Sequence, residues 1–256
     1  MMVSLKLFKP LGRHMRMDKK LSQLGESTWQ HLRKAIKEGD ADSALALSDY
    51  ARIECKGMTD IIVDAWYAFI DWVARNCGEE EVPKAYRYVK GVMDKSLFAK
   101  CADFGVEDLV LWYTEAMRGH FSGPQEEGDF KVYEEEARYV MELDPCGTGG
   151  RLMRGGLDGS PSRIGSFFNL GKTTKPYSWS WSKAGTPYYC VHCCLWHEIM
   201  AIEIRGYPER ITECPVDNPS EPCRIYFYKD PNLIPEFYFE RVGLKKDPAK
   251  FILGSD

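Results

Sequence analysis

Apolar side chains recur at helical spacing through the first half of the chain. Trp29, Leu32 and Ile36 lie three and four positions apart and are followed by Gly39, which predicts a helix over 28–37. The same periodicity predicts four more helices, from Asp40 toward Gly57, from Asp60 to Gly78, from Pro83 past Met93, and from Glu107 to Arg118. Because short connections are typical of packed neighbouring helices, we expect residues 1–122 to form a bundle-like helical region.

The pattern changes after residue 122. The run Ser122-Gly123-Pro124 opens a turn-rich stretch, and we expect a second, Cys-rich region over 123–256. A helix is predicted over 129–142, whereas 146–186 shows no periodicity.

Closer to the C-terminus, a helix is predicted over 191–205, ended by Gly206. Short β-prone runs at 210–214 and 224–228 flank a turn, which indicates a β-hairpin. The expected fold class is therefore α+β: a helical N-terminal region, then a smaller part with a few antiparallel strands packed on a long helix.

Composition and charge exclude some classes of partner. The chain has 256 residues, of which 44% are hydrophobic and 28% charged, and its net charge of −4 comes from interspersed acids and bases. This balance gives no reason to expect a nucleic-acid partner. No apolar run approaches about eighteen residues, so no membrane span is expected. The N-terminus lacks the apolar segment and cleavage site of a signal peptide, which favours a cytoplasmic location.

The cysteines carry the clearest chemical signal. Residues 189–198 include three cysteines and two histidines, and six of the nine cysteines fall between 146 and 223. An odd number of cysteines, with two of them adjacent, fits a disulfide framework poorly. In a reducing compartment such clustering indicates metal ligands or reactive thiols.

The first interpretation is a metal site. Cys190 and Cys193 have the two-residue gap that lets two thiolates reach one tetrahedral ion, and the predicted hairpin supplies Cys214 and Cys223. We therefore expect zinc on these four thiolates. Two alternatives stay open: the cysteines are buried and unligated, or they are catalytic.

The catalytic interpretation has its own physical basis. A cysteine in the first turn of a helix, close to an imidazole, has a lowered pKa, so Cys190 or Cys193 with His197 would make an activated nucleophile. Glu198 or Glu213 would orient the pair or shuttle a proton, although a glutamate such as Glu198 is more often a solvated or core-edge residue than a catalyst. If zinc holds the other four cysteines, Cys146 is the reactive one. The candidate catalytic residues are thus Cys146, His197 and Glu198.

Substrate contacts are expected around the glycine run that follows Cys146. Its backbone N–H groups can form an anion site, and Arg151 and Arg154 can bind a carboxylate. The alternative is a plain turn that needs no ligand. Because the run follows a predicted helix, a dinucleotide site is not expected. Trp181 and Tyr189 would wall a pocket or simply pack in the core.

Two short segments resemble known families. Cys190-Val191-His192-Cys193 and Pro222-Cys223-Arg224-Ile225-Tyr226-Phe227 resemble the L-2-amino-thiazoline-4-carboxylic acid hydrolase-like family. Cys190 or Cys193 with Cys214 and Cys223 is also similar to the zinc-holding cysteines of vinyl-reductase-like small-molecule-binding domains. Ile211 stands where that second pattern has an acidic ligand.

The first resemblance implies hydrolytic opening of a small cyclic amidine-like substrate that carries a carboxylate. The second implies ligand binding without chemistry. The expected function is a hydrolase-like enzyme that cleaves a non-peptide C–N or C–S bond in a small carboxylated molecule at a Cys/His site with zinc. The alternative is a metal-stabilised sensor or binding domain without catalysis.

Overall fold

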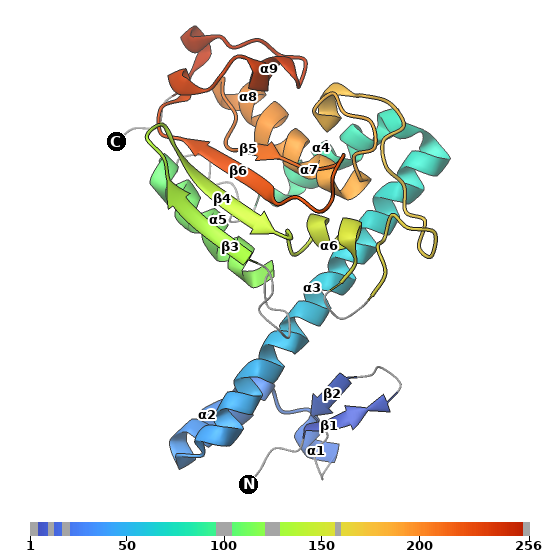
Figure 1. The fold of residues 1–256 in the computed structure, drawn as a ribbon, viewed down its shortest axis with the longest axis vertical. Coiled ribbons are helices and arrows are strands. Elements are labelled where there is room, and N and C mark those ends of the chain that lie inside the picture. Colours follow the sequence, from blue (N-terminus) through green and yellow to red (C-terminus); the bar gives the residue numbers. More distant parts are fainter. Residues whose placement is uncertain are drawn as a thin grey trace.

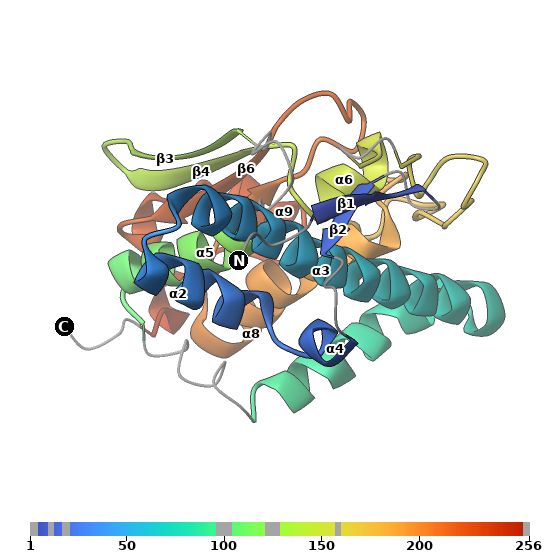
Figure 2. The ribbon, with the colours of Figure 1, turned by 90° about the horizontal axis from the view of Figure 1, so that it is seen from below.

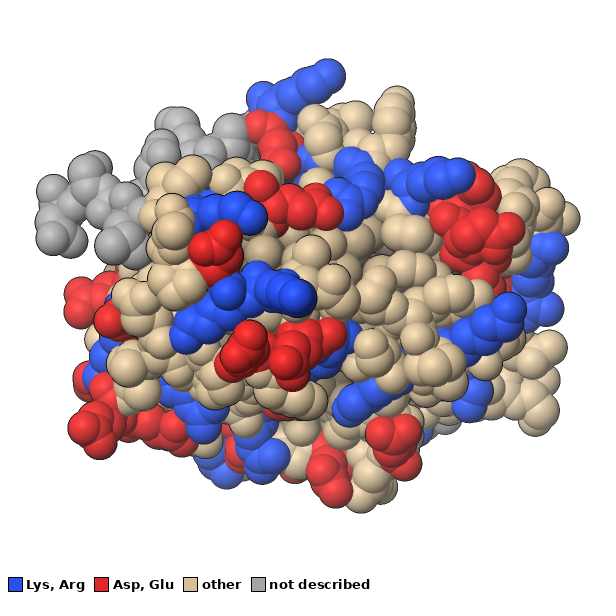
Figure 3. Space-filling model, turned by 90° about the horizontal axis from the view of Figure 1, so that it is seen from above, with Lys and Arg blue, Asp and Glu red and all other residues tan. Residues whose placement is uncertain are grey.

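The computed structural model describes residues 5–9, 13–16, 21–95, 104–120, 129–156 and 160–252. Its first half is mainly helical, and its second half contains a small antiparallel sheet (Figure 1), so the expected α+β class is confirmed. Within these ranges no helix combines the length and the apolar character that crossing a membrane requires. Figure 3 shows acidic and basic side chains mixed on the face seen from above, rather than a field of one sign.

The N-terminal elements lie beside the first half of one long helix. Strands β1 (Leu5–Phe8) and β2 (Arg13–Arg16) pair antiparallel, and the short helix α1 (Leu21–Leu24) follows. Helix α2 (Thr28–Glu38) confirms the prediction for 28–37; Ser27 and Gln30 form its capping box, and Gly39 ends it with φ 72°. In the view from below, α2 runs alongside helix α3 (Figure 2).

Helix α3 (Ala41–Cys77) is continuous, so the predicted break at Gly57 is wrong. A glycine inside a helix costs only about 1 kcal/mol relative to alanine, which the packing along α3 exceeds. Within the continuous helix, the Thr59 hydroxyl donates to the carbonyl of Cys55 at 3.1 Å. Asp40 caps the helix and Gly78 ends it. The helices α4 (Val82–Met93) and α5 (Val106–His120) then follow.

A four-stranded sheet replaces the helix predicted over 129–142, which is wrong. Strands β3 (Asp129–Glu134) and β4 (Arg138–Asp144) form a hairpin, and the strand order is β3-β4-β6-β5, antiparallel throughout. Met141 and Leu143 lie two positions apart on β4 and pack against Ile225 and Phe227 of β6. The apolar side chains of this segment therefore follow the two-residue period of a strand rather than the period of a helix.

The hairpin predicted near the C-terminus is confirmed, because β5 (Ile211–Glu213) pairs with β6 (Cys223–Tyr228). The predicted helix 191–205 is also confirmed, as three consecutive pieces: α7 (Val191–Cys194), a π-helical turn (Leu195–Ile199) and α8 (Met200–Arg205).

Helix α5 and the 191–205 segment cover the same face of the sheet. The ring of Tyr113 on α5 lies 5.6 Å from that of Phe227 on the sheet and 5.4 Å from that of His197. The remaining helical elements are α6 (Gly149–Arg154), α9 (Phe237–Glu240) and short 3₁₀ turns at Glu79–Glu81, Ser178–Ser180, Tyr188–Cys190, Pro231–Leu233 and Pro248–Lys250.

Candidate functional site

Five cysteines line one cavity of about 50 Å³, where the sheet meets α6 and α7. Trp181, Tyr189, His192 and Arg210 are among the other lining residues. The cysteines come from three places: the turn after β4, the start of the 191–205 helical segment, and the two facing ends of β5 and β6. They are Cys146, Cys190, Cys193, Cys214 and Cys223.

The glycine run after Cys146 has a packing reason. A Cβ on Gly149 would lie 2.9 Å from the Sγ of Cys190, and a Cβ on Gly150 would lie 2.8 Å from the Cβ of Pro145. Such distances are too short for any larger residue without movement, so both glycines allow α6 to approach the cavity closely. From the sequence, a dinucleotide site is not expected, because this run is predicted to follow a helix. That reason is wrong, since the run follows strand β4. The strands here are antiparallel, and they do not form the βαβ unit that such a site needs.

Cys193 has the most distinctive surroundings of the five. Its Sγ lies 3.3 Å from His192 Nε2, and Arg210 Nη2 donates to it at 3.6 Å. Burial alone would raise the pKa of Cys193, but the charges of His192 and Arg210 outweigh burial and lower it to about 7. Burial alone would lower the pKa of His192, but the neighbouring Cys193 thiolate outweighs burial, so the pKa of His192 is raised. Both directions favour a thiolate–imidazolium pair.

His192 is held in a fixed orientation. Its Nδ1 lies 2.6 Å from the carbonyl oxygen of Tyr189, to which it donates, and this leaves Nε2 facing the sulfur. The Tyr189 carbonyl in turn accepts a hydrogen bond from the buried hydroxyl of Tyr86 on α4 at 3.1 Å. The imidazole is therefore positioned from two separate parts of the fold.

The other thiols lie in less polar surroundings. Cys214 sits between Cys190 and Cys223. The hydrogen bond with Cys190, together with burial, raises the pKa of Cys214 well above the ordinary value, although the bond with Cys223 lowers it. The bond with Cys214 and burial raise the pKa of Cys223 well above the ordinary value. The Sγ of Cys146 lies 3.4 Å from the hydroxyl of Thr148. Cys214 and Cys223 are therefore protonated thiols near neutral pH, unless a metal ion replaces their protons.

Zinc on Cys190, Cys193, Cys214 and Cys223 remains a prediction. The four side chains do line one cavity. However, no group of three or more Cys, His, Asp or Glu side chains among the described residues is arranged to hold a metal ion.

The structure places neither His197 nor Glu198 among the residues that line the thiol cavity. His197 donates through Nδ1 to the Tyr113 hydroxyl at 2.9 Å, and Tyr113 donates to Glu209 at 2.7 Å. Burial and the neighbouring Arg210 lower the pKa of His197 to about 3, so its ring is neutral. The His197 ring forms part of a neighbouring cleft and is not among the residues that line the thiol cavity.

Glu198 lies at the centre of a buried ion-pair network. Its carboxylate is completely buried, lies 2.9 Å from Arg241 Nη2, and accepts from Trp181 Nε1 at 2.8 Å and from the Thr212 backbone at 2.9 Å. With its acceptor sites taken up in this way, Glu198 ties the helix to β5 and to the segment before Gly243. Trp181 thereby becomes a rigid wall of the cavity.

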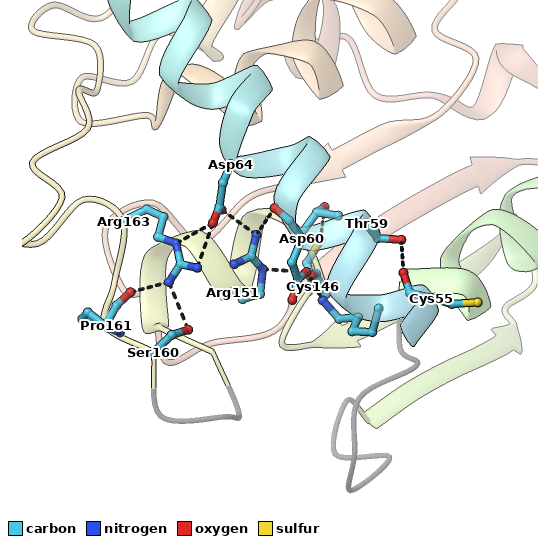
Figure 4. A network of polar contacts seen from close by, with 12 residues as sticks. Cys55, Thr59, Asp60, Asp64, Cys146, Arg151, Ser160, Pro161 and Arg163 are labelled. Atoms are coloured by element: carbon cyan, nitrogen blue, oxygen red, sulfur yellow. Dashed lines mark hydrogen bonds and ion pairs between the residues drawn. The ribbon is translucent and has the colours of Figure 1, made fainter. Parts of the chain in front are cut away.

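Arg151 and Arg154 bind carboxylates of the protein itself. Arg151 Nη2 lies 2.7 Å from Asp64, and its Nε lies 3.0 Å from Asp60, both on α3 (Figure 4). Arg154 pairs with Asp144 at 2.6 Å. Neither arginine lines the cavity, so in this structure both hold α6 in place. Of the four expected substrate contacts, the structure places Trp181 and Tyr189 at the cavity.

Sequence reasoning missed Arg210 as a site residue, and it noted His192 only within a motif. The adjacency of His192 and Cys193 was the available signal for the histidine. The backbone of Arg210 is held against the π-helical turn, since the carbonyl of His197 accepts from the backbone N–H groups of Glu209 at 2.9 Å and Arg210 at 3.5 Å. Such turns occur frequently at functional sites.

Comparison of the chain with protein-family models, with curated proteins and with solved structures gives no significant match. The resemblance carried by residues 190–193 and 222–227 therefore stays a prediction.

Proposed function

We propose that the protein is an enzyme with Cys193 as its nucleophile, which hydrolyses a C–N or C–S bond in a small carboxylated molecule. The observation that carries the proposal is the position of the Cys193 sulfur, between the His192 imidazole and the Arg210 guanidinium at the wall of a cavity. An activated cysteine needs a nucleophile, a base in contact with it and a third group that orients the base. Here these are Cys193, His192 and the Tyr189 carbonyl.

The reaction follows from these positions. The thiolate attacks the electrophilic carbon and forms a C–S bond. The bond to the leaving nitrogen or sulfur breaks, and the leaving atom keeps the electron pair and takes the proton from His192. Neutral His192 then removes a proton from water, the hydroxide adds to the same carbon, and the bond to Cys193 breaks to restore the thiolate. One water is consumed and no electrons are exchanged with another molecule.

Cys193 is favoured over Cys146 by its neighbours. Both line the cavity, but only Cys193 lies beside a protonatable imidazole and a guanidinium at the distances given above. The Sγ of Cys146 contacts the hydroxyl of Thr148 at 3.4 Å, and a hydroxyl carries no charge to stabilise a thiolate.

The test is competitive alkylation with a limiting amount of iodoacetamide, read by mass spectrometry of the peptides. We expect Cys193 to be modified faster than the exposed Cys55 and Cys77, and His192→Gln or Arg210→Gln to slow that modification by about tenfold or more. Arg87→Gln, which removes an exposed pair with Glu203, is the matched control. Modification of Cys193 no faster than of Cys55 and Cys77 would overturn the proposal.

A second candidate is a zinc-stabilised binding domain without catalysis. It is favoured by the neighbouring thiols of Cys190, Cys214 and Cys223, because thiolates are the preferred ligands of structural zinc. Elemental analysis of the purified protein tests it, as set out below.

A further inference from the structure

Arg210 is a buried cation with unused hydrogen-bond donors. It is only 2% exposed, and within the described part of the chain its Nε and Nη1 have no hydrogen-bond partner. Among the described residues, the Cys193 sulfur is the acceptor that its guanidinium reaches, and the guanidinium carbon lies over the Tyr113 ring, 4.6 Å from the ring centroid. A ring face satisfies none of the N–H groups, and leaving them unpaired in a buried site is costly.

This guanidinium lies where two cavities meet. Arg210, His192 and Met117 line both the thiol cavity of about 50 Å³ and a neighbouring cleft of about 560 Å³. The smaller space holds a reacting group but not a whole metabolite, whereas the larger has the size of a ligand-binding pocket. Another pocket of about 590 Å³, beside Tyr226 and Asn232, touches neither Arg210 nor any cysteine.

The cleft between α4, α5 and the 191–205 segment is mainly apolar. Its walls carry the side chains of Trp112, Trp196, Met117, Met200 and Ile204. The other arginine and lysine side chains in it are already matched: Lys90 contacts Asp94, and Arg205 lies 3.8 Å from Glu209. Among the arginine and lysine side chains of this cleft that the structure describes, Arg210 is thus the one that lacks a carboxylate within ion-pair distance.

We propose that Arg210 binds the carboxylate of an organic acid whose flat, apolar body occupies the Trp112–Trp196 cleft. Either Nε or Nη1 can join the second hydrogen of Nη2 in a two-bond fork to that carboxylate. Since Arg210 and Cys193 share the small cavity, the reacting carbon lies only a few bonds from the carboxylate. This proposal rests on the proposed function for the reaction at Cys193, but the binding it describes is independent of the reaction.

The test uses 2-naphthoate, its uncharged analogue 2-naphthamide, and acetate, titrated by calorimetry into the full-length protein. We expect 2-naphthoate to bind at least about tenfold more tightly than either of the others, because one lacks the charge and the other lacks the apolar body. Arg210→Gln should remove the preference for the acid over the amide, and Arg210→Lys should weaken it although the charge is kept.

A second pair of variants tests the cleft without touching the core. Ala116 is exposed and lines the cleft, and Glu115 is exposed but does not. Ala116→Trp should weaken 2-naphthoate binding about tenfold, whereas Glu115→Trp should change neither this binding nor the iodoacetamide modification of Cys193.

Absence of saturable 2-naphthoate binding, or equal affinity for acid and amide, would overturn the inference. A preference for the acid that persists in Arg210→Gln would overturn it as well. Cys193→Ser separates the two proposals, since it should still bind 2-naphthoate. If 2-naphthoate binding depends on Arg210 but Cys193 is unreactive, the enzyme proposal fails and the binding site stands. If Cys193 is reactive but 2-naphthoate does not bind, the binding site fails and the enzyme proposal stands.

Discussion

Arg210 Nη2 lies 3.6 Å from the sulfur of Cys193, although the two residues are seventeen positions apart. The contact crosses from the start of β5 to the first turn of the helical segment that precedes it. A backbone contact supports it, because the carbonyl of His197, in the π-helical turn Leu195–Ile199, accepts the backbone N–H of Arg210 at 3.5 Å. A tertiary contact thus sets the charge beside the candidate nucleophile.

The pH dependence of Cys193 modification follows from its lowered pKa of about 7. The thiolate is the reactive form, so the alkylation rate should rise with pH through a midpoint near 7 and fall below it. His192→Gln and Arg210→Gln each remove a positive neighbour and should shift the midpoint upward, toward the value of about 8.5 for a free cysteine. A midpoint that stays near 7 in both variants would contradict this assignment of cause.

Acid should destabilise the protein through His197. Its pKa is lowered to about 3 in the folded state, so the unfolded state takes up the proton first as the pH falls below about 6.5. The unfolding free energy should therefore decrease from about pH 6.5 toward pH 3, by up to about 1.4 kcal/mol per unit. The contribution of His192 to the unfolding free energy has the opposite sign, since its folded pKa is raised: it is complete below about pH 6.5 and is lost as the pH rises above that value.

His197→Asn, which keeps an N–H near the position of Nδ1, should flatten this slope in urea-unfolding experiments between pH 6.5 and 4.5. Below that range Glu209, whose pKa is lowered to about 2, adds a loss of its own. An unchanged slope in the variant would show that another group is responsible.

Glu198 should prove important for folding rather than for reactivity. Glu198→Ala leaves Arg241 buried without its main partner, a change that typically costs about 3–5 kcal/mol. Glu203→Ala, which removes an exposed pair with Arg87, should cost at most about 1 kcal/mol. Chemical denaturation measures both. Loss of Cys193 reactivity in a well-folded Glu198 variant would instead restore the catalytic role expected from the sequence.

Gly149→Ala should distort the cavity. The new methyl group would lie 2.9 Å from the Cys190 sulfur, and overpacking of this kind costs about 1–3 kcal/mol. Gly91→Ala is the control, since nothing lies within 4 Å of its added Cβ in helix α4, and it should be neutral or stabilising by up to about 1 kcal/mol. Equal melting temperatures for the two variants would contradict the close approach of α6.

If zinc is bound, purified protein should contain about one equivalent, and chelation should lower the melting temperature and expose Cys190, Cys214 and Cys223 to alkylation. A cysteine-to-serine change at Cys214, which lies between the other two, should then remove the metal, whereas Cys55→Ser should not. Metal-free protein with unchanged stability would exclude this candidate.

Local patterns were enough to predict much of the fold. The stop at Gly39, apolar spacing and turn residues act within a few positions, so α2, α4, α5, the 191–205 segment and the β5–β6 hairpin could all be inferred. The segment 129–142 could not, because its short apolar runs fit both helical and strand periods until β6 supplies a partner for β4. The break at Gly57 failed for a similar reason, since neighbouring packing outweighs the cost of one glycine.

The sequence alone identified the cysteines as the chemically important residues, through their number and proximity along the chain. Only the tertiary structure decided which groups face them. Arg151 was expected at a ligand and instead meets Asp60 and Asp64, Glu198 meets Arg241 forty-three positions away, and Arg210 reaches Cys193. Ionisation and hydrogen bonding depend on distance and burial in three dimensions, and neither quantity is encoded in the spacing of residues along the chain.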